Sequence, residues 1–317
     1  MYMRENIMAR YLVTGGAGFI GSNVVYHLLE LKHEVKVLDN FLTGKRENLA
    51  PVLDQITLIE GDLRNFATVL QACHAIDYVL HIAALPSVPR SVADPMLSHN
   101  INVTGTLYVL EAARQQNVKR VVLSSSSSVY GDTPTLPKQE DMPVRPLSPY
   151  AAHKAAGEFY SRIYATIYHL ETVCLRYFNV FGPRQDPLSQ YAAVIPKFIS
   201  ALQAGEQPII YGDGEQSRDF TYIDNVVAAN IAAATAPHAA GEIINIACGV
   251  RITINELAHK IGTLLGKNVQ PQYVPARPGD VKHSLADISK AERLLNYSNR
   301  VDIDAGLPKT VDWFVNL

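Results

Sequence analysis

Cysteine is scarce in this sequence. The three cysteines, Cys73, Cys174 and Cys248, are scattered and set among apolar neighbours. Because a disulfide framework needs dense, paired cysteines, we predict three buried free thiols and a cytoplasmic location. The ten histidines show no paired metal-ligand spacing, which predicts that the protein has no metal site.

Long hydrophobic runs and excess charge are missing as well. No apolar run approaches the ~18 residues that a membrane-spanning helix requires, so we expect no membrane partner. Residues 1–10 lack the apolar core of a signal peptide. The formal net charge of −2 gives no indication of a nucleic-acid partner.

What the chain has is enough apolar material for a large core. Hydrophobic residues make up 48% of the 317 residues and charged residues 18%. This composition predicts a globular chain rather than a disordered one. The length fits one large domain with a smaller lobe.

A glycine-rich loop follows the first expected strand, residues 11–14. Gly15, Gly18 and Gly21 form a G-x-x-G-x-x-G pattern, after which an amphipathic helix extends to about residue 32. Glycines at these positions allow a tight turn, a close approach of a pyrophosphate to backbone N–H groups, and helix–strand packing. The loop therefore predicts a dinucleotide site.

Asp39 ends the second expected strand, residues 35–39, and lies 18 residues beyond Gly21. A carboxylate at this position accepts hydrogen bonds from the adenosine ribose and repels a 2′-phosphate, which favours NAD over NADP. Lys45 and Arg46 support the opposite choice, since either could meet that phosphate. Asp62 fits either a helix cap or an adenine contact.

Strands and helices then alternate regularly. We expect strands at 56–60, 78–82, 118–125 and 172–177, a loop at 85–91, and helices at about 95–116 and 150–169. Strands separated by helices in this way predict a doubly wound parallel (Rossmann) sheet, which binds ligands at its carboxyl edge. Ala83 and Ala84, after the fourth strand, are small enough for a cofactor to lie against them.

Two polar motifs belong near that edge. A run of serines, 124–128, follows the fifth strand and is either a polar loop or a set of hydroxyls facing the cofactor. Tyr150 and Lys154 are four residues apart at the start of an alanine-rich helix, which places both on one helix face. There the ammonium can lower the tyrosine pKa and make the phenol a usable base.

The pattern changes after residue 179. We expect a helix at about 194–204, Asp224 as the N-cap of a helix at 226–234, a strand at 242–247, and a helix at 253–265 with a Thr253/Glu256 capping pair. Two short helices end the chain. No linker separates two halves, which predicts a smaller α/β lobe interleaved with the first domain. We assign 1–178, with a return at about 224–250, to the cofactor domain, and 179–223 with 251–317 to the substrate lobe.

Taken together, these motifs resemble the extended short-chain dehydrogenase/reductases, and within them the UDP-sugar 4-epimerases. The resemblance covers residues 11–312 and rests on 14–21, 39–41, 124–131, 150–154, 176–179, 217–220 and 277–280. The sequence is most similar to epimerases of UDP-N-acetylglucosamine, because it shares their stretches 87–91, 184–187, 191–197 and 283–287.

The resemblance implies an isomerase with tightly bound NAD. Tyr150 would take the proton of the sugar 4-hydroxyl, Lys154 would lower the tyrosine pKa and hold the nicotinamide ribose, and Ser126 would hydrogen-bond the 4-oxygen. NAD must stay bound, because the hydride is returned within one turnover. The implied cofactor contacts are Gly15, Gly18, Phe19, Ile20, Gly21, Asp39, Asn40, Phe41, Thr43, Gly44, Asp62, Leu63, Ile82, Ala83, Ala84, Asn102, Ser124, Tyr150, Lys154 and Phe178.

The resemblance also implies how a UDP-sugar binds. Asn179, Arg218 and Arg277 would grip the diphosphate, for which guanidinium groups are suited. Asp280 would hold the uridine ribose, and Tyr211 would stack near uracil. The remaining implied substrate contacts are Ser87, Arg90, Ser126, Ser127, Tyr150, Gln185, Ala193, Val194, Lys197 and Ser284.

The small Ser284 would leave room for an N-acetyl group where epimerases restricted to UDP-glucose and UDP-galactose carry tyrosine. UDP-glucose remains a possible substrate, as does UDP-glucuronate, whose carboxylate Arg90 could contact. The 4,6-dehydratases carry an Asp-Glu pair where Ser127 and Ser128 stand here, so elimination lacks its acid and base. A non-catalytic NAD-sensing protein is the alternative from another class. The family also implies a homodimer formed through helices 95–116 and 150–169.

Overall fold

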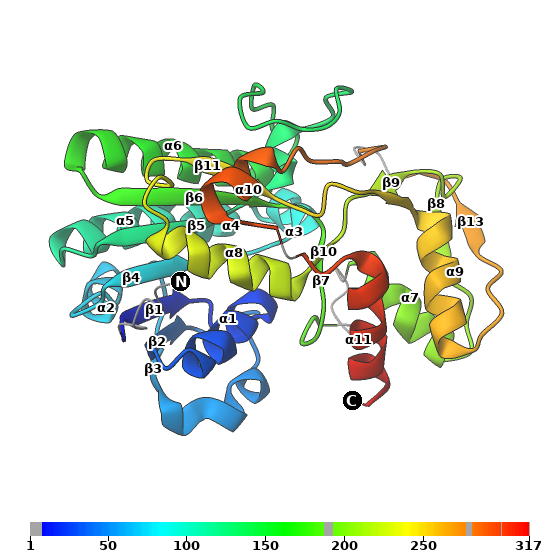
Figure 1. Ribbon diagram of the computed structural model, residues 1–317, viewed down its shortest axis with the longest axis horizontal. Coiled ribbons are helices and arrows are strands. Elements are labelled where there is room, and N and C mark those ends of the chain that lie inside the picture. The colour runs from blue at the N-terminus through cyan, green and yellow to red at the C-terminus, as the bar shows by residue number, and fades with distance from the viewer. Residues whose placement is uncertain (1–7, 187–192, 277–280, 299, 317) are drawn as a thin grey trace, which may run out of the picture. The chain divides into compact units, whose positions relative to one another are not determined.

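The computed structural model describes residues 8–186, 193–276, 281–298 and 300–316. Its largest element is a seven-stranded sheet in the order β11-β6-β5-β4-β1-β2-β3 (Figure 1). The strands are β1 (Arg10–Thr14), β2 (Glu34–Asp39), β3 (Ile56–Glu60), β4 (Tyr78–His81), β5 (Arg120–Ser126), β6 (Glu171–Tyr177) and β11 (Ile243–Ile246). Neighbours from β5 to β3 pair in parallel. The predicted parallel sheet is therefore confirmed.

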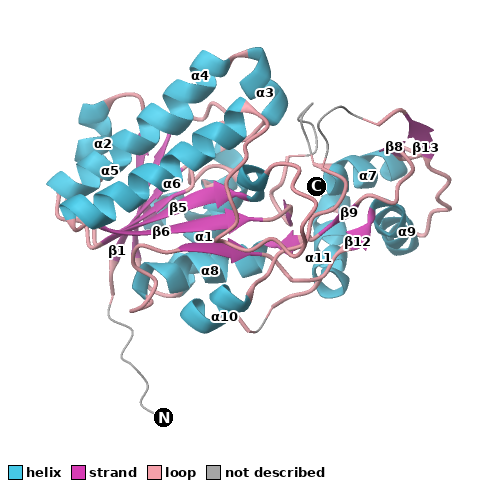
Figure 2. Cartoon of the chain, turned by 90° about the horizontal axis from the view of Figure 1, so that it is seen from above, coloured by secondary structure: helices cyan, strands magenta, loops and turns pink. Residues whose placement is uncertain are grey.

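Helices cover both faces of this sheet (Figure 2). On one face lie α2 (Phe66–Ala72), α5 (Gly105–Gln115) and α6 (Pro149–Tyr168), and on the other α1 (Phe19–Glu30) and α8 (Ile223–Thr235). A sheet covered on both faces needs strands that are apolar throughout, and β1 and β5 are buried along nearly their whole length. The fold is a doubly wound, Rossmann-like α/β fold.

The chain forms two compact units. The first unit comprises Met1–Ser125, Ser148–Leu175 and Val227–Ile243, and the second comprises Ser126–Leu147, Arg176–Val226 and Ile244–Leu317. Each unit is thus assembled from three stretches of the chain. The functional domains assigned from the sequence stay a prediction.

The second unit contains short strands between helices. Three two-stranded sheets pair β7 (Val180–Phe181) with β10 (Thr221–Tyr222), β8 (Ile209–Tyr211) with β13 (Gln272–Val274), and β9 (Ser217–Arg218) with β12 (Ile252–Thr253). Its helices are α7 (Val194–Gln203), α9 (Ile254–Leu265), α10 (Ser289–Leu295) and α11 (Ile303–Val315). The predicted Thr253/Glu256 capping box begins α9.

Several expected boundaries are wrong. The segment after β4, expected to be a loop, contains the helix α3 (Val88–Ala93), which Ser87 caps. The single helix expected at 95–116 is α4 (Pro95–His99), a π-helical turn at Asn100–Thr104, and then α5. Asp224 lies in the first turn of α8, one residue inside the helix, and is not its N-cap.

The composition led to expectations about the cysteines, about membrane-spanning helices and about metal sites. Cys73 and Cys174 are buried free thiols, whereas Cys248 is only partly buried. Among the described residues, no helix is both long and apolar enough to span a bilayer, and no cluster of histidine, cysteine and acidic side chains suits a metal ion.

Candidate functional site

The glycine loop has the backbone geometry that a phosphate cradle needs. Gly15 has a φ of 71°, and a Cβ there would lie 2.6 Å from the Cα of Ala83. Both the positive φ and this close approach require glycine. Gly18 is the N-cap residue of α1 and provides no side-chain cap, and the first turn has no acidic residue. The N–H groups at Phe19 and Ile20 are thus suited to an anion.

Asp39 joins this loop to the end of β2. Its Oδ2 accepts a hydrogen bond from the Ala17 N–H (2.9 Å) and its Oδ1 from the Phe41 N–H (2.8 Å). Burial raises the pKa of Asp39, and the backbone hydrogen bonds oppose that rise. A carboxylate offers about four acceptor positions, so Asp39 can also accept a ligand hydroxyl. Gly44 packs closely here, since a Cβ on it would lie 2.8 Å from that of Ala17.

Lys45 and Arg46, the two cations that could bind a 2′-phosphate, follow Asp39 in the sequence. The guanidinium of Arg46 is 2.6 Å from Glu60 and stacks 4.0 Å from the centre of the Phe41 ring. Arg46 therefore already has an anionic partner. Lys45 donates its backbone N–H to the carbonyl of Ala17 (3.0 Å).

Asp62 forms a polar cluster at the end of β3. It accepts hydrogen bonds from Asn40 (2.8 Å) and from two atoms of the Arg64 guanidinium (2.9 and 2.7 Å). The hydrogen bonds from Arg64 hold the pKa of Asp62 far below its usual range, so it remains a carboxylate. Leu63 is buried, whereas Ile82, Ala83 and Ala84 are half-buried.

Tyr150 and Lys154 lie on the same side of α6, as their spacing predicts. Ser148 caps this helix, and the Tyr150 N–H donates to Ser91 Oγ (3.0 Å). The Lys154 ammonium lies 5.9 Å from the centre of the Tyr150 ring. It donates to the carbonyl oxygen of Ser124 (2.7 Å). Burial lowers the pKa of Lys154 to about 8.

Ser126 ends β5 and begins a short 3₁₀ helix, Ser127–Tyr130. Its Oγ accepts hydrogen bonds from the Ser128 N–H (3.2 Å) and the Ser128 hydroxyl (2.9 Å). With both acceptor positions used, the Ser126 hydroxyl hydrogen is left to donate. The side chain is therefore set up as a donor. Ser127 is half-buried.

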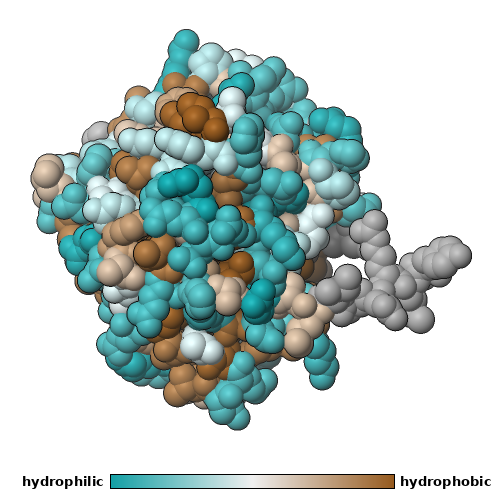
Figure 3. Space-filling view, turned by 90° about the vertical axis from the view of Figure 1, so that its left-hand side faces the viewer, coloured by the Kyte–Doolittle hydropathy of each residue, from teal (hydrophilic) through white to brown (hydrophobic). Residues whose placement is uncertain are grey.

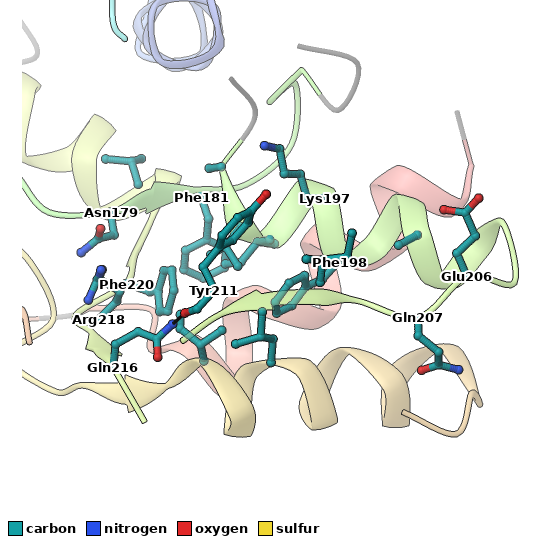
Figure 4. A pocket seen from close by; sticks show the side chains of 18 residues that line it. Asn179, Phe181, Lys197, Phe198, Glu206, Gln207, Tyr211, Gln216, Arg218 and Phe220 are labelled. Carbon is teal, nitrogen blue, oxygen red and sulfur yellow. Dashed lines mark hydrogen bonds between the residues drawn. The ribbon is translucent and has the colours of Figure 1, made fainter. Parts of the chain in front are cut away.

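A cavity of about 510 Å³ lies within the second unit. Six of the predicted substrate contacts line it: Asn179, Ala193, Val194, Lys197, Tyr211 and Arg218. In Figure 4, Asn179 and Arg218 lie at one end, Glu206 and Gln207 at the other, and Lys197 and Tyr211 between them. The volume lies within the ~300–1,000 Å³ typical of small-molecule sites.

The polar end of this cavity is fixed by backbone contacts. Asn179 donates to the carbonyl of Asp219 (2.9 Å), and its amide lies 3.4 Å from Ser284 Oγ. Arg218 donates to the carbonyls of Ser217 (2.9 Å) and Lys282 (3.1 Å). The amide oxygen of Gln185 is buried and has no hydrogen-bond partner among the described residues.

Other predicted contacts have different surroundings. Ser87 Oγ accepts the N–H of Arg90 (3.2 Å) as the cap of α3, and Phe178 is buried. Thr43 is exposed in the segment before the 3₁₀ turn at 46–48. The amide of Asn102 is buried and bonded to protein atoms. Arg277 and Asp280 lie outside the described residues.

Sequence reasoning missed two organising residues. Ser91, which fixes the backbone of Tyr150, lay in a stretch expected to be a loop. Asp219 is completely buried and accepts the N–H groups of Cys248, Gly249 and Ala286. Burial raises its pKa to about 6. Asp219 lies in the stretch 217–220 that carries the resemblance, but an aspartate beside an arginine gives no sign of such distant partners.

Comparisons with known proteins agree on one protein family. Residues 11–247 match the NAD dependent epimerase/dehydratase family. The chain is 41% identical to a UDP-glucose 4-epimerase of Mycolicibacterium smegmatis over 97% of its length and 99% of the relative. It is 38% identical to a UDP-glucuronate 4-epimerase of Thermodesulfobacterium geofontis, covering 96% of each.

A solved structure is similar over nearly the whole chain. It is a UDP-N-acetylglucosamine 4-epimerase from Methanobrevibacter ruminantium M1 in complex with UDP-N-acetylmuramic acid. The sequence identity is 45% and the TM-score 0.93, over 98% of this chain and 99% of the other.

Proposed function

Because this chain belongs to the NAD-dependent epimerase/dehydratase family, we propose that it interconverts UDP-N-acetylglucosamine and UDP-N-acetylgalactosamine through a 4-keto sugar. We propose that it also interconverts UDP-glucose and UDP-galactose. The enzyme is an isomerase. The observation that carries the proposal is the buried Lys154 ammonium beside Tyr150 on α6. This pair supplies a base for a sugar hydroxyl.

The first unit fits NAD. The uncapped N-terminus of α1 suits the pyrophosphate, and the Asp39 carboxylate has lone pairs for the ribose hydroxyls. The Asp39 carboxylate supports NAD over NADP, because it repels a 2′-phosphate, and Arg46 has an acidic partner in Glu60. When bound, NAD supplies a reversible acceptor for the hydride of sugar C4.

The residues of the chain move the proton and hold the sugar. Tyr150 takes the proton of the 4-hydroxyl as a phenolate, a form that the neighbouring Lys154 ammonium favours. Ser126 donates its hydroxyl hydrogen to the 4-oxygen. The same groups return the proton once the keto sugar has presented its other face.

The second unit anchors the UDP part in the cavity of Figure 4. Arg218 and Asn179 hold the diphosphate at its polar end, Tyr211 stacks near uracil, and Lys197, Ala193 and Val194 form its wall. Arg277 completes the diphosphate grip and Asp280 binds the uridine ribose. An anchored UDP leaves the sugar free to turn over between half-reactions.

In this proposal small side chains and one amide oxygen accommodate the N-acetyl group. Ser284 and Ser87 leave space beside sugar C2. The buried amide oxygen of Gln185, which has no hydrogen-bond partner among the described residues, supports a role as acceptor for a substrate N–H. UDP-glucuronate is the alternative substrate, supported by the relative from T. geofontis, and Arg90 would then meet the sugar carboxylate.

A homodimer through α6 is part of the proposal. Phe159, Ile163 and Ile167 follow one another at i, i+4 and i+8, and their exposed fractions are 60%, 43% and 63%. An apolar stripe at this spacing suits packing against a second helix. Figure 3 shows brown apolar groups separated by teal polar ones on the face seen from the left of Figure 1. We assign the dimer contact to the α6 stripe.

The function is tested with purified protein and no added cofactor. Incubation with UDP-N-acetylglucosamine, UDP-glucose and UDP-glucuronate separately is expected to yield the C4 epimers of the first two. Denaturing the protein is expected to release NAD into the supernatant. Activity that depends wholly on added NADP, or epimerisation of UDP-glucuronate alone, would contradict the proposal.

Replacing Ser284 with tyrosine is expected to change the sugar preference. A phenol ring at this half-buried position would fill the space for the C2 substituent, at a cost of about 1–3 kcal/mol or more. Ser284→Tyr should therefore suppress epimerisation of UDP-N-acetylglucosamine and largely spare UDP-glucose. Ser284→Ala is the matched control and should keep both activities. Equal loss for both sugars in the tyrosine variant would show that Ser284 does not border the C2 substituent.

A further inference from the structure

A continuous chain of buried polar groups crosses the first unit. His81, at the end of β4, contacts Thr14 Oγ1 with Nδ1 (2.7 Å) and Thr106 Oγ1 with Nε2 (2.9 Å). Thr106 donates in turn to the carbonyl oxygen of Asn102 (2.7 Å). All four residues are at most 4% exposed. The chain therefore excludes water along its whole length.

The partners of each group determine where every hydrogen atom of this hydrogen-bond chain lies. The Thr106 hydrogen is used on the carbonyl of Asn102, so Thr106 can only accept from His81. His81 therefore carries its proton on Nε2, and its Nδ1 accepts the hydroxyl hydrogen of Thr14. Thr14 Oγ1 also accepts the N–H of Ala83 (3.3 Å). Burial and the Lys154 charge lower the pKa of His81 to about 3, which keeps the ring neutral.

The far end of the chain holds the segment that follows β4. Asn102 lies in the π-helical turn at Asn100–Thr104, where Gly105 N–H bonds five residues back to the carbonyl of Asn100. Asn102 Oδ1 accepts the N–H of Leu85 (2.7 Å), and its Nδ2 donates to the carbonyl of Leu85 (3.3 Å) and to Ser98 Oγ (3.3 Å). The carboxamide is thus fully used on protein atoms.

We propose that His81 and Asn102 are positioning residues, which hold residues 83–87 rigidly through the chain Thr14–His81–Thr106–Asn102. One end of the chain binds the Ala83 N–H and the other binds Leu85. This inference rests on the proposed function, in which Ser87 leaves space beside sugar C2, and on Ala83 and Ala84 as the cofactor contacts that the resemblance implies. Asn102 then acts through Leu85 and does not itself touch the cofactor.

The test breaks the chain at its middle with an isosteric substitution. Thr106→Val removes one hydroxyl, which leaves the His81 Nε2–H without its acceptor and takes the side-chain donor away from the Asn102 carbonyl. We expect faster amide hydrogen exchange in residues 83–87. We also expect kcat to fall by about 10- to 100-fold, the scale that a small misplacement of reacting groups causes, while KM stays within about twofold.

Two matched variants separate this role from a general loss of packing. Thr106→Ser keeps the hydroxyl and is expected to restore both the slow exchange and kcat. Thr104→Val makes the same substitution two residues away, at a half-buried hydroxyl that has no hydrogen bond among the described residues, and should behave like the unchanged protein. Asn102→Asp, which keeps the acceptor for Leu85 but loses both donors, breaks the other end if Thr106→Val does not fold.

The outcomes are distinct. Loss of kcat without faster exchange in 83–87 would overturn the proposal, as would faster exchange with unchanged kcat, or a rise in KM alone. An unchanged protein that epimerises no UDP-sugar would refute the proposed function. In that case, the exchange rates of Thr106→Val and Thr104→Val still decide whether the chain holds residues 83–87.

Discussion

Replacing Tyr150 with phenylalanine is expected to lower kcat by about 10²–10⁴, the usual contribution of one proton-transfer group. The substitution deletes only the phenol oxygen. The backbone of Tyr150 keeps its hydrogen bond to Ser91 Oγ, and the Ser148 cap of α6 is untouched. KM for the UDP-sugar should change little, because Tyr150 does not line the cavity that we propose for UDP.

The control is another tyrosine on the same helix. Tyr160 is half-buried and packs against the apolar core cluster, so Tyr160→Phe removes a hydroxyl without touching the proposed site. We expect its kcat to match that of the unchanged protein. Both variants should retain NAD and unfold at the same temperature. A Tyr150→Phe protein with near-normal turnover would contradict the assignment of the base.

The parts of the fold that follow from local pattern were predictable. Strand β3 has the predicted bounds, and β1, β2, β4, β5 and β6 differ from prediction by one or two residues at either end. The signal is the run of apolar residues in each strand, which is buried along nearly its whole length in β1, β5 and β6. The spacing of Tyr150 and Lys154 predicts a shared helix side for the same reason, because 3.6 residues per turn is a property of the local backbone.

The segment after β4 shows where local pattern fails. Pro86 and Pro89 suggest a loop, yet Ser87 and Asp94 cap two short helices whose prolines occupy first-turn positions. The π-helical turn at Asn100–Thr104 is held by side chains from β4 and from residues 98 and 106. His81 is 25 residues from its partner Thr106, so a short window of residues does not reveal this contact.

The second unit was the least predictable part for a related reason. Strands of two or three residues, such as β7 and β9, have too few positions to show a period. Asp219 binds N–H groups from two other segments, and this contact depends on tertiary structure alone. The cavity walls likewise combine α7, β8 and residues 216–220. The resemblance to a family, rather than periodicity, pointed to Asn179, Lys197, Tyr211 and Arg218.

Replacing Lys154 with methionine is expected to lower kcat at pH 7 by about a hundredfold or more. Methionine is apolar and of similar length, so it fills the buried site while removing the ammonium that favours the Tyr150 phenolate. The hydrogen bond to the Ser124 carbonyl is lost as well. Lys267→Met, on an exposed lysine, is the control and should leave turnover unchanged.

The pH dependence gives this variant a distinctive signature. Lys154 is charged below its lowered pKa of about 8, so activity of the unchanged protein should fall as pH rises past that value. Lys154→Met has no ammonium to lose, and its phenol ionises only toward the ordinary tyrosine pKa of about 10. Its activity should therefore keep rising between pH 8 and 10, and the difference between the two proteins should narrow.

The stability of the protein provides a second measure of the pKa of Lys154, independent of catalysis. Burial lowers the pKa of Lys154 in the folded protein from 10.5 to about 8, so the unfolded chain binds more protons between these values. The free energy of unfolding must then rise with pH across this interval. Lys154→Met lacks that contribution, so its unfolding free energy should rise less than that of the unchanged protein between pH 8 and 10.5. Parallel denaturant titrations at several pH values measure the difference, and identical slopes would show that folding does not lower the pKa of Lys154.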